Sequence, residues 1–272
     1  MLWSTGFIAA KYGLPYAPPL KFLLIRFLLA ATLMTFVAIG TRARWPSGLR
    51  QIGHVAVAAS LVHGLYLGGV FLSIAAGMPA GTSAMLVGLQ PILTVFLARA
   101  WLGERIAARQ WSGLVLGLGG VWLVVRHKIA LDGDFVTLLP IVVALVAISV
   151  GTLYQKRFVA HVDLRAGAVI QFGACFLLYT PLVAWLEPAP VRWTVPFAFA
   201  LGWSVVVLSV GAVSLLYGLL RHGAAADVAR LFYLVPPVTA LMAFALFGER
   251  LDALAIVGMV LICVAVALAR RR

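Results

Sequence analysis

Residues 90–105 read QPILTVFLARAWLGER, and residues 235–250 read VPPVTALMAFALFGER. The two stretches align without a gap at an offset of 145 residues, and both end in the triplet Gly-Glu-Arg. The same offset superimposes further identical residues: Gly6 on Gly151, Lys11 on Lys156, Ile25 on Ile170, Phe27 on Phe172, Pro91 on Pro236, Thr94 on Thr239, Ala98 on Ala243 and Gly113 on Gly258. A duplicated unit in a very apolar chain is typical of transporters built from two halves.

The composition indicates that the bilayer is the solvent of this chain. Hydrophobic residues make up 64% of it, charged residues only 11%, and the mean hydropathy is +1.08. A water-soluble domain of this length could not bury so much apolar surface in one core. Nine apolar stretches are of membrane-spanning length, at residues 20–39, 55–76, 82–101, 107–125, 136–155, 166–185, 195–220, 228–247 and 253–269.

A tenth helix is expected at the start of the chain. Residues 1–12 are apolar but too short to cross roughly 30 Å of hydrocarbon. At the offset of 145, Met1 aligns with Val146, which lies about ten residues into the apolar stretch that begins near Val136. We therefore expect the first helix to be truncated at its N-terminus relative to its repeat; a naturally short interfacial helix is the alternative.

The repeat predicts an all-α integral membrane protein with ten transmembrane helices, arranged as two inverted five-helix repeats. An odd number of helices per unit forces the second copy to enter the membrane upside down. The expected units are a first repeat at residues 1–127, a connector with the start of the sixth helix at 128–145, and a second repeat at 146–272. Such an architecture favours alternating access to a site near the middle of the membrane.

The positive charges predict that both termini are cytoplasmic. With the first helix starting inside, fourteen Lys and Arg residues fall on the cytoplasmic side and six on the other, while Arg26 lies within a helix. The net charge of +13 thus indicates topology and contact with anionic lipid. Binding of nucleic acid is not expected, because the basic residues are spread over short loops without interleaved aromatic residues.

Several short motifs mark the first helix with its exit and the fourth helix with its end. They are Gly6, Lys11, Pro19, Arg26-Phe27, Gln90-Pro91 and the helix end Leu102-Gly103-Glu104-Arg105. With them, the chain resembles the EamA family of the drug/metabolite transporter superfamily over both halves. The resemblance implies ten helices, a bacterial inner (plasma) membrane location and export of amino acids or related metabolites, without fixing the substrate.

Prolines interrupt the expected fourth and ninth helices at equivalent positions. Pro91 and Pro236 each remove an amide donor, and each breaks the bond to the carbonyl four residues earlier. The freed carbonyls must find partners within the membrane, so we expect a cavity lining or a hinge there. A kink that only shapes packing is the alternative for each proline taken separately.

Ionisable side chains at membrane depth are further candidates because burying them unpaired is expensive. Arg26 lies about two turns into the second helix and is a candidate for holding a substrate carboxylate. The slightly favoured alternative is a structural ion pair with Glu249, with Gln171 and Glu104 making the equivalent contact. His63 is the most plausible titrating group if transport couples to protons, although a hydrogen-bonded structural histidine is the commoner case.

Other polar and aromatic side chains are expected to line the passage. The set also includes Tyr66, Gln90, Thr152, Tyr154, Trp203, Tyr217 and Tyr233. Apolar walls with a few hydroxyl groups and aromatic rings suit a small amphipathic solute. The helix-end residues Glu104, Arg105, Glu249 and Arg250 are expected to be structural. Gly113 and Gly117 form a face that would allow a homodimer.

Other chemistry is not expected. Cys175 and Cys263 fall in different helices without metal-ligand spacing, and no glycine-rich phosphate loop occurs, so neither a metal, a cofactor nor an enzymatic activity is predicted. The leading hypothesis is a secondary transporter exporting small metabolites such as amino acids. The alternatives are a drug or sugar-derivative transporter of the same fold, and, from another class, a membrane scaffold or an intramembrane enzyme.

Overall fold

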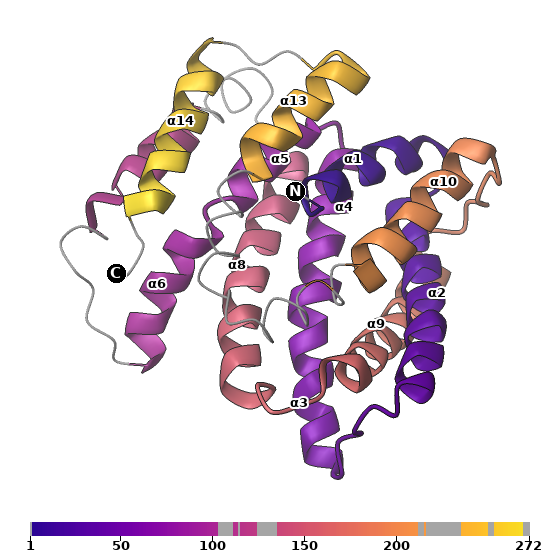
Figure 1. Cartoon of the computed structure of the whole chain (residues 1–272). Coiled ribbons are helices and arrows are strands. Elements are labelled where there is room, and N and C mark those ends of the chain that lie inside the picture. The colour runs from indigo at the N-terminus through magenta and orange to yellow at the C-terminus, as the bar shows by residue number, and fades with distance from the viewer. Residues whose placement is uncertain are drawn as a thin grey trace.

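The structure is a computed structural model that describes residues 2–102, 111–113, 115–123, 135–211, 215, 235–249 and 253–268. Throughout these residues all regular structure is helical (Figure 1). Helices are favoured in a lipid bilayer, because a helix satisfies its backbone hydrogen bonds within one segment. The predicted all-α membrane class is therefore confirmed.

Residues 2–102 contain eight helical segments. They are α1 (Ser4–Gly13), the short 3₁₀ turn η1 (Leu14–Tyr16), α2 (Pro19–Gly40), α3 (Leu49–Ala59), η2 (Ser60–Leu65), α4 (Tyr66–Ala75), α5 (Ala80–Val87) and α6 (Gln90–Leu102). The second half contains α8 (Phe135–Phe158), α9 (Leu164–Leu186), α10 (Val195–Trp203), η3 (Ser204–Gly211), α13 (Val235–Phe247) and α14 (Ala253–Leu268). A further apolar helix occupies Trp111–Leu123.

Within the described residues, five helical stretches are long and apolar enough to cross a membrane by length and composition. They are Pro19–Gly40, Leu49–Ala75, Ala80–Trp101, Val136–Phe158 and Leu164–Leu186. Shorter apolar helices at Trp111–Leu123, Val195–Gly211, Val235–Phe247 and Ala253–Ala265 accompany them. Their outward faces carry large exposed side chains such as Phe36, Leu177 and Leu241, as expected where lipid takes the place of water.

Two helix pairs form the centre of the molecule. α2 packs along α9, while the continuous run α3–η2–α4 packs along α8 (Figure 1). α2 and α9 begin at residues 19 and 164, and α6 and α13 begin at residues 90 and 235, so both pairs of starts are separated by the offset of the sequence repeat. α6 and α13 also have the same length, 13 residues.

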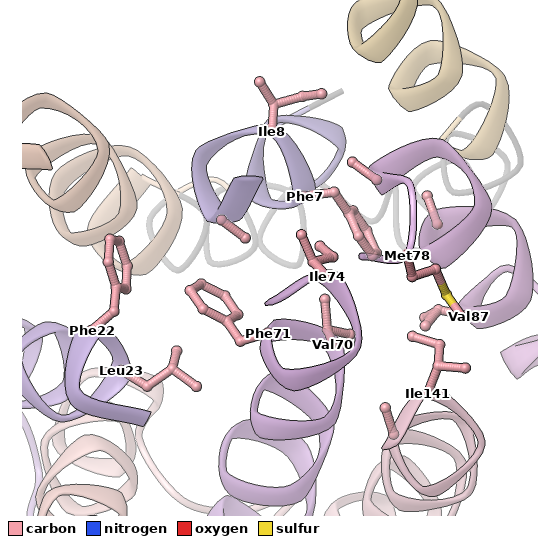
Figure 2. Close-up of a cluster of buried hydrophobic side chains, with 14 of the residues drawn as sticks. Phe7, Ile8, Phe22, Leu23, Val70, Phe71, Ile74, Met78, Val87 and Ile141 are labelled. Atoms are coloured by element: carbon pink, nitrogen blue, oxygen red, sulfur yellow. The ribbon is translucent and has the colours of Figure 1, made fainter. Parts of the chain in front are cut away.

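The largest buried cluster extends across both halves of the chain, and several of its aromatic side chains gather where α1 lies next to α2 and α4. Phe22 of α2 packs against Phe71 of α4 and Phe197 of α10, at ring-centroid distances of 5.2 and 5.6 Å. Figure 2 shows Phe7 of α1 extending down toward Ile74 and Met78, with Phe71 between them and Phe22. α1 is thereby attached to both halves of the chain, although it has only 10 residues.

α4 and α8 approach each other closely because a glycine lies between them. A β-carbon added to Gly69 would come within 2.2 Å of the carbonyl oxygen of Pro140 and 2.9 Å of the Ala144 side chain. Small residues at such contacts let helix backbones meet in a membrane, where van der Waals packing provides much of the association energy. This contact fixes the long run α3–η2–α4 on α8.

Two π-helical segments interrupt the α-helices at matching places. η2 spans Ser60–Leu65, and η3 spans Ser204–Gly211; adding the repeat offset to η2 gives residues 205–210, inside η3. A π segment leaves backbone carbonyls in need of other partners, and Tyr179 Oη donates to the Gly64 carbonyl at 2.9 Å. Such segments are frequently found at functional sites.

Candidate binding site inside the membrane

Arg26 lies on the buried side of α2 and is 7% exposed. Its Nε atom has no hydrogen-bond partner among the described residues. The predicted ion pair with Glu249 is wrong, because the Glu249 carboxylate pairs with Lys11 of α1 instead. Sequence reasoning placed Arg26 and Glu249 toward the same membrane face but could not give the distance between their helices.

Glu249 joins three helices at one end of the molecule. Its carboxylate pairs with Lys11 Nζ and accepts hydrogen bonds from the backbone amides of Ala80, at 3.0 Å, and Gly81, at 3.3 Å. These amides belong to the first turn of α5, where the helix dipole favours negative charge. Lys11 also lies 5.2 Å from the centre of the Phe247 ring. The contact holds α1 and α5 against the end of α13.

His63 and Gln171 are hydrogen-bonded between η2 and α9. The distance from His63 Nε2 to Gln171 Oε1 is 2.9 Å, and the His63 ring lies 5.1 Å from that of Phe172. A side-chain carbonyl oxygen only accepts, so His63 Nε2 carries the hydrogen. Arg26 interacts electrostatically with both His63 and Tyr66. Arg26, His63, Tyr66 and Gln171 therefore form one polar cluster, called the central cluster below.

The repeat places equivalent residues on either side of this cluster. Phe27 and Phe172, which are related by the offset of 145 residues, stack on each other with ring centroids 6.4 Å apart and planes 22° apart. Arg26 and Gln171, the residues just before them, are related in the same way. The central cluster thus lies where α2 meets its own repeat, α9.

Gln90 and Thr152 form a second contact, between α6 and α8. Gln90 Nε2 donates to Thr152 Oγ1 at 3.0 Å. Pro91 follows Gln90 directly. The helix is interrupted at residues 88–89, between α5 and α6, as expected from the amide hydrogen that Pro91 lacks. Pro236 of α13 packs on the other side of this break, since a β-carbon on Gly88 would meet its ring at 2.8 Å. Both prolines therefore lie next to the break, Pro91 by sequence and Pro236 by packing.

Other predicted site residues lie outside the central cluster. Tyr154 Oη is 2.7 Å from His54 Nδ1, nearer the α3 end of the bundle. Trp203 Nε1 donates to Thr5 Oγ1 at 2.9 Å, which joins α10 to α1. The remaining predicted residues lie outside the described part of the chain: Tyr217, Tyr233, Glu104, Arg105 and Arg250.

A pocket of about 320 Å³ opens between α8 and α9. Thr152 and Gln171 line it, so it reaches both the second contact and the central cluster, and Lys156 and Asp163 lie toward the loop that joins the two helices. Its volume falls within the range of about 300–1,000 Å³ typical of small-molecule sites. Of the central cluster, only Gln171 lines the pocket, which therefore connects this residue with the loop end of α8 and α9.

Asp163 organises the mouth of this pocket. It begins α9 by accepting a hydrogen bond from the backbone amide of Arg165 at 2.9 Å, and the Arg165 guanidinium pairs with it at 2.7 Å. The hydrogen bond from the Arg165 side chain lowers the pKa of this carboxyl from 3.8 to about 2. Arg165 also donates to the carbonyl of Thr41, which ties the end of α2 to the start of α9.

Two participants were not among the predicted site residues. Gln171 entered the sequence reasoning only as the neutral repeat equivalent of Arg26, yet it is the partner of His63. Lys11 was predicted only as a motif residue of the first helix and as a charge on the non-cytoplasmic side, although its alignment with Lys156 at the repeat offset was a signal that could have identified it. Within the described residues, no group of three or more His, Cys, Asp or Glu side chains is arranged to hold a metal ion.

Comparison with known families agrees with this architecture. A model of the EamA-like transporter family matches residues 1–126 and again residues 136–271. The chain belongs to the EamA-like transporter family. This EamA-like chain is therefore a multi-pass membrane protein, and the family indicates a transporter rather than an enzyme.

Relatives across bacteria carry transporter names. The chain is 28% identical to the "Uncharacterized transporter YvbV" of Bacillus subtilis (strain 168), over 98% of this chain and 88% of that protein. It is 28% identical to the "Probable amino-acid metabolite efflux pump" of Escherichia coli (strain K12), over 96% and 89%. It is 30% identical to the "Probable terminal-alkyne amino-acid exporter" of Streptantibioticus cattleyicolor, over 72% and 65%. These names support a general exporter role.

A solved crystal structure shares the fold. Its TM-score is 0.64 at 19% sequence identity, and the match covers 98% of this chain and 93% of the other. At that identity the likeness shows the fold alone.

Proposed function

We propose that this EamA-like protein exports small amphipathic metabolites, amino acids or their derivatives, by alternating access between two inverted halves. The observation that carries the proposal is the central cluster, in which buried Arg26 has no hydrogen-bond partner for its Nε atom and exerts an electrostatic influence on His63, which is hydrogen-bonded to Gln171. Ionisable side chains at membrane depth are costly and usually mark a substrate or ion pathway. The relatives named as an amino-acid metabolite efflux pump and an amino-acid exporter support the class of solute.

The proposed architecture has ten transmembrane helices, five in each half, in the bacterial inner membrane with both termini cytoplasmic. The family model matches each half separately, which supports a duplicated unit. The agreement of the starts of α2 with α9 and of α6 with α13 supports equivalent helices in the two halves. The excess of Lys and Arg in the loops assigned to the cytoplasm supports the orientation.

Two irregularities of the helix backbone would let the two halves move while the rest of each helix stays intact. The π segments η2 and η3 occupy equivalent positions, and η2 carries His63 itself. The break at residues 88–89 separates α5 from α6 next to Pro91. Hinge motions are absorbed at a few positions near the ends of elements, where backbone angles can change at low cost. We propose that these positions are the hinges.

The other partners stay predictions. The lipid bilayer and a small-molecule solute are expected partners, and nucleic acid is not. The face of Gly113 and Gly117 is buried within the chain, since a β-carbon on Gly117 would meet the side chain of Ile92 at 2.7 Å. A homodimer through this helix stays a prediction and would use its exposed side chains Val115, Leu118 and Trp122 instead.

Flux through purified protein in liposomes tests the proposal. Liposomes are preloaded with one unlabelled amino acid at a time and diluted into a trace of the same labelled amino acid. Transport predicts a transient accumulation of label that saturates with solute concentration and does not occur in protein-free liposomes. Absence of accumulation across the amino-acid panel, with correctly folded protein in the bilayer, would contradict amino-acid transport.

A further inference from the structure

Arg26 is a buried cation that lacks an acidic partner in the described structure. Three acidic residues are described, and each is occupied elsewhere: Asp163 by Arg165, Glu249 by Lys11, and Glu187 by the backbone amides of Leu20 and Lys21. Arg26 Nε has no hydrogen-bond partner there either. A buried charge without a partner costs several kcal/mol. The site is therefore suited to a negative group that is not part of the described chain.

The repeat explains why Arg26 lacks the partner that its equivalent has. Gln171 is hydrogen-bonded to His63, and the repeat offset relates His63 to Leu208 of η3. In the position that would face Arg26 by this symmetry, the chain therefore has an aliphatic side chain, which cannot accept a hydrogen bond. Gln171 therefore has a polar partner, whereas the equivalent position for Arg26 holds an aliphatic residue.

The central cluster offers hydrogen-bond donors. Because Gln171 Oε1 accepts from His63, the side-chain amide nitrogen of Gln171, a residue that lines the pocket, keeps two hydrogens for another acceptor. Tyr66, which interacts electrostatically with Arg26, carries a hydroxyl donor. A planar guanidinium with neighbouring donors matches a carboxylate, which accepts through two oxygens.

The pocket between α8 and α9 provides access for such a group. Lys156 and Gln155 lie along it, and Gln171 marks the point at which it reaches the central cluster. A carboxylate entering from this end would meet a cation first and then the amide donor of Gln171, next to the cluster that contains Arg26.

We propose that Arg26, assisted by Gln171, binds the carboxylate of the transported solute. This proposal rests on the proposed function, because it specifies the substrate as one with a carboxylate. It excludes neutral amides and purely cationic solutes as good substrates. The aromatic rings of Phe27 and Phe172 beside the cluster give an apolar wall for the rest of the molecule.

Binding to purified protein in detergent tests the proposal without requiring transport. L-phenylalanine and N-acetyl-L-phenylalanine both have the carboxylate, whereas L-phenylalaninamide lacks it, so the three separate the carboxylate from the amine. Thermal unfolding is followed for wild type, Arg26→Met, Arg26→Lys and the exposed control Arg50→Met. We expect both carboxylates to raise the melting temperature of wild type and Arg50→Met, and the amide to have no effect.

Arg26→Met is expected to lose the response to both carboxylates, and Arg26→Lys to keep part of it, because a lysine retains the charge but not the planar fork. Without ligand, Arg26→Met should melt at a higher temperature than wild type, since an unpaired buried charge has been removed. A lower melting temperature would show that Arg26 has a structural partner and would overturn the proposal. Equal responses of Arg26→Met and wild type, or no response to either carboxylate in wild type, would do the same.

The liposome experiment separates this inference from the proposed function. Carboxylate-dependent stabilisation that requires Arg26, together with no flux, would leave the binding site intact and contradict transport. Flux that is unaffected by Arg26→Met would leave transport intact and overturn the carboxylate site.

Discussion

Replacing Lys11 by Met is expected to weaken the junction of α1, α5 and α13. The side chain of Glu249 is 8% exposed, and that of its partner Lys11 is 32% exposed. Charge-assisted hydrogen bonds contribute roughly 1.5–3 kcal/mol net, and partial exposure moves a pair toward the lower end. We therefore expect Lys11→Met to lower the free energy of unfolding by about 1.5–2 kcal/mol.

Glu249→Gln should cost more than Lys11→Met, because it also removes the negative charge at the first turn of α5. The assay is unfolding of the purified protein by SDS in mixed micelles, followed by tryptophan fluorescence. Lys21→Met is the control, since Lys21 Nζ is exposed and donates to the backbone carbonyl of Ala189 at 2.6 Å. Its effect should stay below about 1 kcal/mol.

The double variant decides whether the two side chains act together. If the side chains are coupled, Lys11→Met should lower the free energy of unfolding only slightly once Glu249 is already Gln. The losses of the two single variants should then add up to at least about 1 kcal/mol more than the loss of the double variant. Additive effects, agreeing within about 0.5 kcal/mol, would refute the reasoning that the pair stabilises this junction.

Three further predictions follow from the described contacts. Gly68→Ala should lower the free energy of unfolding by about 1–3 kcal/mol, because its β-carbon would lie 2.3 Å from Tyr179 Oη. Gly173→Ala is the control and should have no such effect, since nothing lies within 4 Å of its β-carbon. Unfolding in mixed micelles compares the two variants. Asp163 has a lowered pKa, so its ion pair should stabilise the fold above pH 3.8, and this contribution should be lost as the pH falls toward 2. Asp163→Asn should remove that part of the pH dependence of the melting temperature, and an unchanged profile would contradict it. Thr152→Cys, with the native cysteines replaced, should react with a membrane-impermeant maleimide faster in inside-out than in right-side-out vesicles; equal rates would contradict access through the pocket between α8 and α9.

The sequence predicted the all-helical class and the long apolar helices, because lipid imposes helical length and hydropathy on a membrane span. The agreement between α6 and α13 was visible in the Gln90–Arg105 and Val235–Arg250 stretches before any coordinates. The break near Pro91 was likewise predictable, because a missing amide has a local effect.

The contacts between helices were less predictable. Arg26 and Glu249 were expected to pair from their depths alone, but α1 brings Lys11 to Glu249 instead. The position of a residue along its helix gives the depth of its side chain in the membrane, but it does not give the direction in which the side chain points around the helix axis. The π segments were also unforeseen, since neither SLVHGL nor SVVVLSVG contains a residue that demands a wider turn. His63 and Gln171 met because helix packing placed them together.

The central claim is that a solute is held at the central cluster by Arg26. An experimental structure of the protein determined with a transported amino acid tests it most directly. The account predicts the solute carboxylate within hydrogen-bond distance of the Arg26 guanidinium and the Gln171 amide, reached from the pocket between α8 and α9. A solute bound elsewhere, with Arg26 paired to an acidic side chain of the protein, would contradict it.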